Sequence, residues 1–210
     1  MTTTPRRALI VIDVQQDYFG GPLEIQYPST GESLAQITRA IDAATAAGIP
    51  VVAVQHLAGE EAPVFNPTLP GFALHPEVEA RRTADWTSVV KRHGTVFAGT
   101  GLAAWLAERG IDTVTLVGYM TNNCVIASAA EAETHGLAAE VLSDATGAIH
   151  LANDAGFVDA RTVHTTLMVL LNSNFAAVAD TASWVGAVEA GRGLASSDLG
   201  ASAVAGAGRA

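Results

Sequence analysis

Cysteine, lysine and long apolar runs are scarce in this sequence. The single cysteine, Cys124, excludes a disulfide within the chain. No apolar run reaches the roughly 18–20 residues that a membrane span requires. The opening MTTTPRR leads directly into ALIVIDV, without the separate apolar segment and cleavage site of a signal peptide. We therefore expect a cytoplasmic protein with no membrane partner.

Positive charge is also sparse. The 210 residues include 11 Lys and Arg against 21 Asp and Glu, which gives a formal net charge of −10. A nucleic-acid-binding protein normally shows a basic stripe, and none is present. Because 49% of the residues are hydrophobic and 15% are charged, the chain can bury a substantial core, and its length suits one α/β domain or two very small ones. We expect a small-molecule substrate and no nucleic-acid partner.

Lysine occurs once, as Lys91, beside ten arginines. Arginine stays protonated, whereas a lysine ammonium is compact and its pKa changes readily on burial. Taken alone, Lys91 is explained by drift in an arginine-biased composition. Its place beside the only cysteine in one plausible site favours a functional role.

Buried-strand patterns alternate with helical spacing along the chain. This alternation implies an α/β fold with a doubly wound, mainly parallel sheet and helices on both faces, in three layers. The predicted strands are 8–15, 50–56, 87–92, 113–118, 137–143 and 174–180, and the predicted helices are 33–47, 102–109, 122–135 and 155–171.

The segments outside this pattern differ in composition. Residues 57–84 are rich in Pro, Gly and Glu, and so long a loop in a compact domain is usually a lid or a pocket wall. We divide the chain into a flexible N-terminus at 1–7, one folded domain at 8–185, and a Gly/Ala-rich tail at 191–210 that we expect to be mobile.

Three chemically competent residues follow predicted strands. Ligands of an open α/β sheet bind beyond the carboxyl ends of its strands, which is where Asp13, Lys91 and Cys124 lie. A helix start and a nearby ammonium lower the pKa of a thiol, a carboxylate can carry its proton, and free N–H groups can bind an oxyanion. Singly, the three are explained as a turn aspartate, a solvated lysine and an inert cysteine. Their joint position favours catalysis.

Three stretches resemble the isochorismatase-like cysteine hydrolases, which include nicotinamidases and N-carbamoylsarcosine amidohydrolase. They are ALIVIDVQQDYF around Asp13, VVKRHGTVFAGTGLAAWLAERGIDTVTLVGYMTNNCV at 89–125, and EVLSDATGA at 140–148. They occur in the family's order and cover most of residues 8–180. The second stretch is the most specific of the three.

The resemblance implies a catalytic triad of Asp13, Lys91 and Cys124 and six strands in the order 3-2-1-4-5-6. It implies a non-proline cis peptide bond between Tyr119 and Met120. Backbone N–H groups of Met120 and Cys124 would then form the oxyanion hole. It also implies a homodimer or a larger homo-oligomer as the working assembly.

The resemblance bears on the reaction and on metals. True isochorismatases lack the nucleophilic cysteine, so Cys124 favours cleavage of a small amide-type C–N bond through a thioester intermediate. Nicotinamidases hold a metal with an Asp-x-His pair and a later His, but this chain has no Asp between Asp42 and Asp85 and only His56 and His75 in that region. Two His residues without a carboxylate make a weak metal site. We expect neither a metal nor another cofactor.

Other functions stay open. The substrate can instead be a ureido, lactam or isochorismate-type compound, or the chain can be a non-catalytic binding module on the same fold. A redox role is disfavoured because no second cysteine can resolve an oxidised thiol.

The substrate pocket is less defined by the sequence. Arg92 binds a substrate carboxylate or lies on the surface, and His164 is a packed or exposed helical residue. Aromatic residues at such positions are more often core than pocket. The candidates for the pocket are Tyr18, Phe19, Phe65, Trp86 and Asn123.

Overall fold

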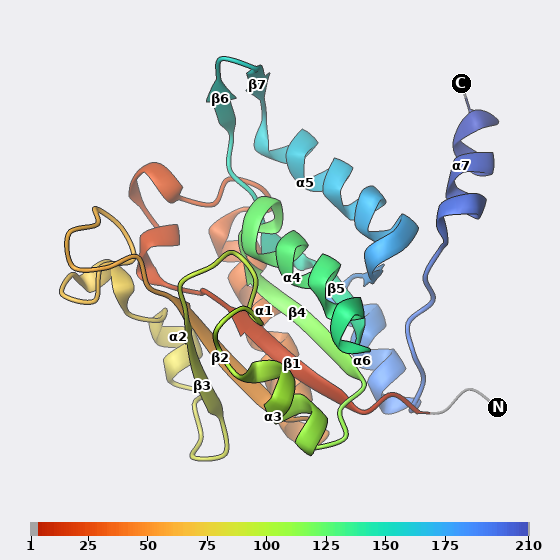
Figure 1. The fold of residues 1–210 in the computed structure, drawn as a ribbon, viewed down its shortest axis with the longest axis horizontal. Helices are drawn as coiled ribbons and strands as arrows, with labels where there is room; N and C mark the ends of the chain where they lie inside the picture. The colour runs from red at the N-terminus through yellow and green to blue at the C-terminus, as the bar shows by residue number, and fades with distance from the viewer. Residues whose placement is uncertain (1–3, 210) are drawn as a thin grey trace.

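The computed structural model describes residues 4–209 and contains the predicted doubly wound sheet (Figure 1). Six parallel strands lie in the order β3-β2-β1-β4-β5-β8. This confirms the predicted order, because β8 is the sixth strand of the sheet and a separate hairpin supplies β6 and β7. The strands are β1 (Arg7–Ile12), β2 (Val51–His56), β3 (Thr87–Lys91), β4 (Thr113–Tyr119), β5 (Ala138–Gly147), β6 (Leu151–Asn153), β7 (Gly156–Val158) and β8 (Ala177–Ala179).

Helices cover both faces of the sheet (Figure 1). One face packs against α3 (Leu102–Glu108), α4 (Ile126–Ala132) and the end of α5 (Ala160–Leu170). The other face packs against α1 (Thr30–Ala46), α6 (Thr181–Glu189) and the single turn α2 (Pro76–Glu79). The last helix, α7 (Leu199–Ala207), stands apart from the sheet.

Strand β1 shows why its sequence is apolar without interruption. Ile10 and Ile12 belong to the core on the α3–α4 side, whereas Leu9 and Val11 belong to the core on the α1 side. All four side chains are fully buried. A strand covered on both faces cannot alternate polar and apolar residues, so the run itself predicts a central strand.

The predicted helix 155–171 is wrong at its start. Residues 156–158 form β7, and α5 begins only at Ala160. The Asp159 carboxylate caps the helix by accepting the N–H of Thr162 at 3.0 Å. Gly156, at φ +137°, opens β7 directly after the turn at 154–155, in a conformation that favours glycine. The hairpin is short and exposed, so its sequence lacks the alternation of apolar and polar residues that would predict it.

Other boundaries move by a few residues. Helix α1 starts at Thr30, earlier than predicted, because Ser29 and Glu32 form a capping box. Strand β5 continues to Gly147, and β8 is shorter than the predicted 174–180 because residues 171–175 extend α5 by a π-helical turn.

The chain ends differ in part from the prediction. The predicted boundary after residue 7 is one residue late, because Arg7 opens β1 and its guanidinium lies 2.7 Å from Glu140 Oε1 with both side chains buried. Residues 1–3 lie outside the described residues, so their flexibility stays a prediction. In the tail, α7 buries no side chain, and the mobility of the tail also stays a prediction.

No helix within residues 4–209 is both long and apolar enough to cross a membrane.

Candidate active site

Asp13 occupies the first position after β1. The strand ends at Ile12 rather than at the predicted residue 15, because Asp13 turns the backbone to φ +49°. Its N–H still bonds to Val54 O on β2 at 2.9 Å, which anchors the turn to the sheet. The side chain is fully buried, and non-glycine residues with positive φ are concentrated at functional sites.

Lys91 is the last residue of β3 and brings its ammonium group to Asp13. Its Nζ lies 2.7 Å from Asp13 Oδ2, and neither side chain reaches solvent. The same Nζ donates to Cys124 Sγ at 3.1 Å and to the carbonyl of His93 at 3.2 Å. The ammonium group therefore connects the carboxylate to the thiol.

Cys124 lies in a π-helical turn, Thr121–Val125, that joins β4 to α4. Its side chain is buried. Ser128 fixes the turn, because its hydroxyl donates to Cys124 O at 2.6 Å and accepts from Val96 N–H at 3.1 Å. The structure thus brings the three predicted residues together from the carboxyl ends of β1, β3 and β4.

Electrostatics at the site favour a protonated thiol. Burial raises the pKa of Cys124 to about 12, the negative charge of Asp13 raises it too, and Lys91 only partly opposes them. The lowered thiol pKa expected from the sequence is wrong, because burial and the carboxylate outweigh the ammonium. Burial likewise raises the pKa of Asp13 to about 6 against the lowering effect of Lys91.

The Asp13 carboxylate has unused acceptor capacity. Its contact with Lys91 is an ion pair outside ordinary hydrogen-bond angles, so neither oxygen accepts a hydrogen bond from the residues at 4–209. A buried carboxylate with a pKa near 6 is ionised at neutral pH and readily takes a proton. The arrangement suits proton transfer from the thiol during a reaction.

His56 is the residue at this site that the sequence did not reveal as a neighbour of Lys91. It ends β2, pairs in register with Lys91 on β3, and places Nδ1 at 3.0 Å from Lys91 Nζ. Burial, and after it the charge of Lys91, lowers the pKa of His56 to about 4. The strand-end rule that selected Lys91 would also have selected His56.

A metal at this position would compete with the ammonium group. Within residues 4–209, Asp13, His56 and Cys124 form the only group of three potential metal ligands, with ligand atoms within 4.8 Å of one another. Lys91 Nζ lies within 3.1 Å of an atom of each of the three, so it occupies the centre of the group. The residues present fit an ammonium ion better than a metal.

His75, the other histidine considered for a metal, has a different role. Its Nδ1 accepts the N–H of Glu77 and caps α2, and its ring packs against Phe19 with centroids 4.2 Å apart. It does not join the ligand group of His56.

Gln15 and Asp17, which follow Asp13, form hydrogen bonds that hold the long loop 57–84 at the site. Gln15 is fully buried, donates to the carbonyls of His56 and Phe72, and accepts the His56 N–H at 2.8 Å. Asp17 Oδ2 accepts the N–H of Phe65 at 2.6 Å. Neither role was predicted, because both depend on where the loop returns to the sheet.

Two of the predicted pocket residues, Tyr18 and Phe65, lie beside the triad and His56. Phe65, at φ +52°, sets its ring 5.1 Å from the His56 ring and 5.3 Å from the Tyr18 ring. Tyr18 is buried, and the charges of Cys124 and Asp13 contribute to raising its pKa, after burial. Phe19 packs against Tyr119, with ring centroids 5.8 Å apart.

Asn123 and Trp86 differ from this group. Asn123 is exposed beside the nucleophile, with its Oδ1 next to Gly94. Trp86 is wrong as a pocket residue, because it precedes β3 and a five-residue strand separates it from Lys91 by roughly 15 Å. It lines a cavity with Ile49 and Trp105 at the amino ends of the strands.

Two further residues considered from the sequence are also placed. Arg92 is exposed. His164 is a packed histidine: its Nδ1 lies 3.0 Å from Thr121 Oγ1, its Nε2 lies 2.9 Å from Ser143 O, and burial lowers its pKa. It ties α5 to the turn that carries Cys124.

The predicted oxyanion donors lie in the same turn. The Tyr119–Met120 peptide bond is cis, at the position that the resemblance implies. The Met120 N–H donates to no other group among residues 4–209, whereas the Met120 carbonyl accepts from Asn123 and Val125 at 3.1 Å each.

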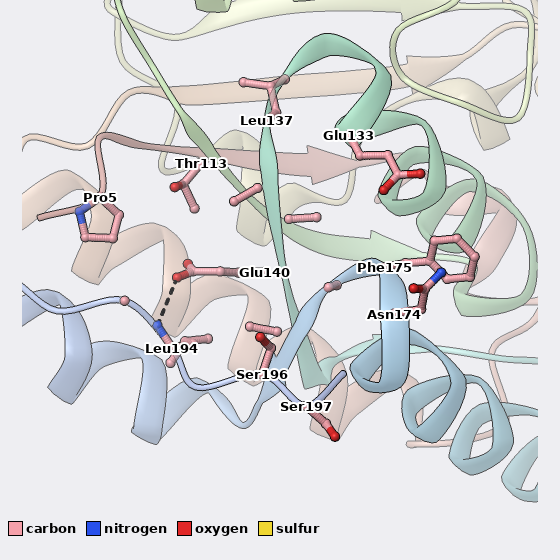
Figure 2. A pocket seen from close by; sticks show the side chains of 15 residues that line it. Pro5, Thr113, Glu133, Leu137, Glu140, Asn174, Phe175, Leu194, Ser196 and Ser197 are labelled. Atoms are coloured by element: carbon pink, nitrogen blue, oxygen red, sulfur yellow. Dashed lines mark hydrogen bonds between the residues drawn. The ribbon is translucent and has the colours of Figure 1, made fainter. Parts of the chain in front are cut away.

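A separate cavity of about 330 Å³ lies at the amino ends of the strands, at the end of the sheet away from the triad. Figure 2 shows it between the chain around Leu194, Ser196 and Ser197 and the amino ends of β4, β5 and β8. Its buried acid, Glu140, already accepts from Arg7, Thr115 and Trp184. This cavity therefore has no part in the triad's chemistry.

Comparison with known proteins identifies the family of the chain. A family model described as the isochorismatase domain matches residues 7–183. A protein assigned as an isochorismatase, from Burkholderia xenovorans LB400, is 48% identical in sequence. Its crystal structure superposes on 99% of each chain with a TM-score of 0.95. The isochorismatase family protein YddQ of Bacillus subtilis, described as uncharacterized, is 31% identical over 180 residues, which are 85% of this chain and 98% of that protein. The nicotinamidase/pyrazinamidase of Mycobacterium tuberculosis is 30% identical over 165 residues, covering 68% of this chain and 87% of that protein. The chain therefore belongs to the isochorismatase family of hydrolases.

Proposed function

We propose that this hydrolase cleaves an amide-type C–N bond of a small molecule through a thioester on Cys124. One observation carries the proposal: a single buried ammonium, Lys91 Nζ, lies 2.7 Å from the Asp13 carboxylate and 3.1 Å from the Cys124 sulfur. A nucleophile, a base and the group that orients both are thereby assembled without solvent between them.

Acylation begins with the protonated thiol. Cys124 Sγ attacks the substrate carbonyl carbon while its proton moves to Asp13, so a C–S bond forms and the carbonyl electrons move to oxygen. The N–H groups of Met120 and Cys124 stabilise this oxyanion. Collapse of the intermediate breaks the C–N bond, and Asp13 gives its proton to the departing nitrogen, which leaves as an amine or ammonia.

Deacylation reverses the proton path. Water attacks the thioester carbonyl as Asp13 takes one of its protons, the C–S bond breaks, and the proton returns to Cys124. Lys91 stays protonated throughout and holds the carboxylate and the sulfur at fixed positions. A base with a pKa near 6 suits both transfers.

Two observations favour an amide over the alternatives. The presence of Cys124 in a connected triad speaks against a non-catalytic binding module, and the similar Mycobacterium tuberculosis protein is named for amide substrates. A ureido or lactam compound has the same carbonyl carbon and leaving nitrogen, so it remains the second candidate, ahead of an isochorismate-type substrate.

The experiment is a substrate panel with a defined covalent readout. Ammonia or amine release is measured for small amides, ureido acids and lactams, and intact-mass spectrometry of the quenched enzyme detects an acyl group on the chain. We expect turnover and the acyl mass with the wild type and neither with Cys124→Ala. Glu108→Ala, exposed at the end of α3 and outside the candidate site, is the control and should retain the acyl mass. An active Cys124→Ala variant would refute the mechanism.

We also propose a homodimer or larger homo-oligomer and a cytoplasmic location. The exposed apolar side chains of Leu199 and Val204 on α7 support assembly through an additional surface.

A further inference from the structure

His56 has no part in the proposed reaction, yet it touches the centre of the site. It is half-buried at the end of β2, and its Nδ1 lies 3.0 Å from Lys91 Nζ. The ring lies edge-on to Phe65, with centroids 5.1 Å apart. The Gln15 side chain accepts the His56 N–H and donates to the His56 carbonyl. The ring is thus supported on several sides.

The partner of His56 decides its tautomer. An ammonium group has three N–H donors and no acceptor, so Nδ1 must be the accepting nitrogen. The ring hydrogen is then on Nε2 and the imidazole is neutral. Protonation would place a second cation beside Lys91, which is consistent with a His56 pKa lowered by burial and by Lys91.

The ammonium group is held by three hydrogen bonds and one ion pair. Its three N–H donors serve His56 Nδ1 at 3.0 Å, Cys124 Sγ at 3.1 Å and His93 O at 3.2 Å, and Asp13 Oδ2 lies 2.7 Å away as the ion-pair partner. Of these four partners of Lys91, only the Asp13 carboxylate carries a negative charge before the reaction begins. Without a competing acceptor on β2, Coulomb attraction would draw the ammonium towards Asp13 and away from the sulfur.

We propose that His56 is a positioning residue: it is a neutral acceptor that holds the Lys91 ammonium between Asp13 and Cys124. The inference rests on the proposed function for its catalytic consequence, but the hydrogen bond itself does not depend on turnover. A loosely held ammonium would leave the thiol and the carboxylate misaligned, and such misplacement costs about 100-fold in rate.

His56→Asn and His56→Leu are a matched pair for the test. Both side chains have the same branched shape, but only asparagine keeps an acceptor at the place of Nδ1. Because the chain has one lysine, ¹⁵N-lysine labelling gives a single ammonium signal in NMR spectra. We expect a protected Lys91 signal in the wild type and in His56→Asn, and loss of that protection in His56→Leu. If His56→Leu does not fold, His56→Ala replaces it.

Kinetics give the second readout. On the best substrate of the panel, kcat should fall by about 100-fold in His56→Leu with little change in KM, whereas His56→Asn should stay within about tenfold of the wild type. Equal ammonium signals, or equal kcat losses, in the two variants would overturn the proposal. Failure of the proposed function is distinguishable, because the wild type would then show no Cys124-dependent turnover while the NMR contrast still reports on His56.

Discussion

Acidification below about pH 6 should switch off hydrolysis through Asp13. Burial raises the pKa of this carboxyl from its ordinary 3.8 to about 6, although Lys91 opposes the shift. Asp13 must be ionised to accept the thiol proton, so activity is present above this pKa and is lost as the pH falls through it. Ionisation of the thiol does not affect the pH profile in this range, because the pKa of Cys124 is about 12.

The magnitude follows from the ionised fraction. With a pKa of about 6, kcat/KM should be about half its plateau at pH 6, about one tenth at pH 5 and about one hundredth at pH 4. An ordinary aspartate would still be about nine tenths ionised at pH 5, so pH 5 separates the two cases. Because Asp13, Lys91 and Cys124 interact, the measured value belongs to the group as a whole.

The assay is kcat/KM for ammonia release from pH 4 to 8 at constant ionic strength. Circular dichroism at each pH checks that the fold survives, and Asp13→Asn, which cannot accept the proton, should be inactive throughout. A profile that stays flat down to pH 5 with the fold intact would refute the reasoning, as would an active Asp13→Asn variant.

The remaining predictions concern charge, stability, metals and assembly. Lys91→Arg should lose nearly as much activity as Lys91→Ala, because a planar guanidinium cannot keep the three hydrogen bonds and the ion pair that surround a compact ammonium; near-normal kcat in the arginine variant would show that charge alone suffices. Arg7→Ala should lower the free energy of unfolding by about 3–5 kcal/mol, because it leaves the Glu140 carboxylate buried without its cation. Arg6→Ala, at an exposed ion pair, should cost about 1 kcal/mol or less in the same denaturant titration, and equal losses would contradict the burial argument. Activity should survive exhaustive chelation with EDTA and nicotinamide should be a poor substrate; about one metal ion per chain by elemental analysis, with activity lost on chelation and restored by metal, would reverse both expectations. Light scattering at micromolar concentration should return a dimer or larger assembly, and a monomer mass would reject it.

The sequence alone determined the sheet and the approximate position of its chemistry. A short uninterrupted apolar run rich in β-branched residues, such as ALIVI in β1, is typical of a strand covered on both faces. Parallel strands end at one edge, so residues that follow β1, β3 and β4 must converge there. Asp13, Lys91 and Cys124 were therefore predictable as neighbours, although their distances were not. The same rule would have excluded Trp86, which precedes its strand.

The tertiary structure decided the properties of the site. Whether the pKa of Cys124 lies above or below its ordinary value depends on how deeply the thiol is buried and how close Asp13 lies, and no local pattern encodes either. The contact of His56 with Lys91 depends on the register between β2 and β3. The position of Phe65 depends on the Asp17 hydrogen bond that fixes the returning loop. Secondary structure follows from short-range periodicity, whereas pKa values and hydrogen-bond partners follow from burial and from side chains that meet only in the folded chain.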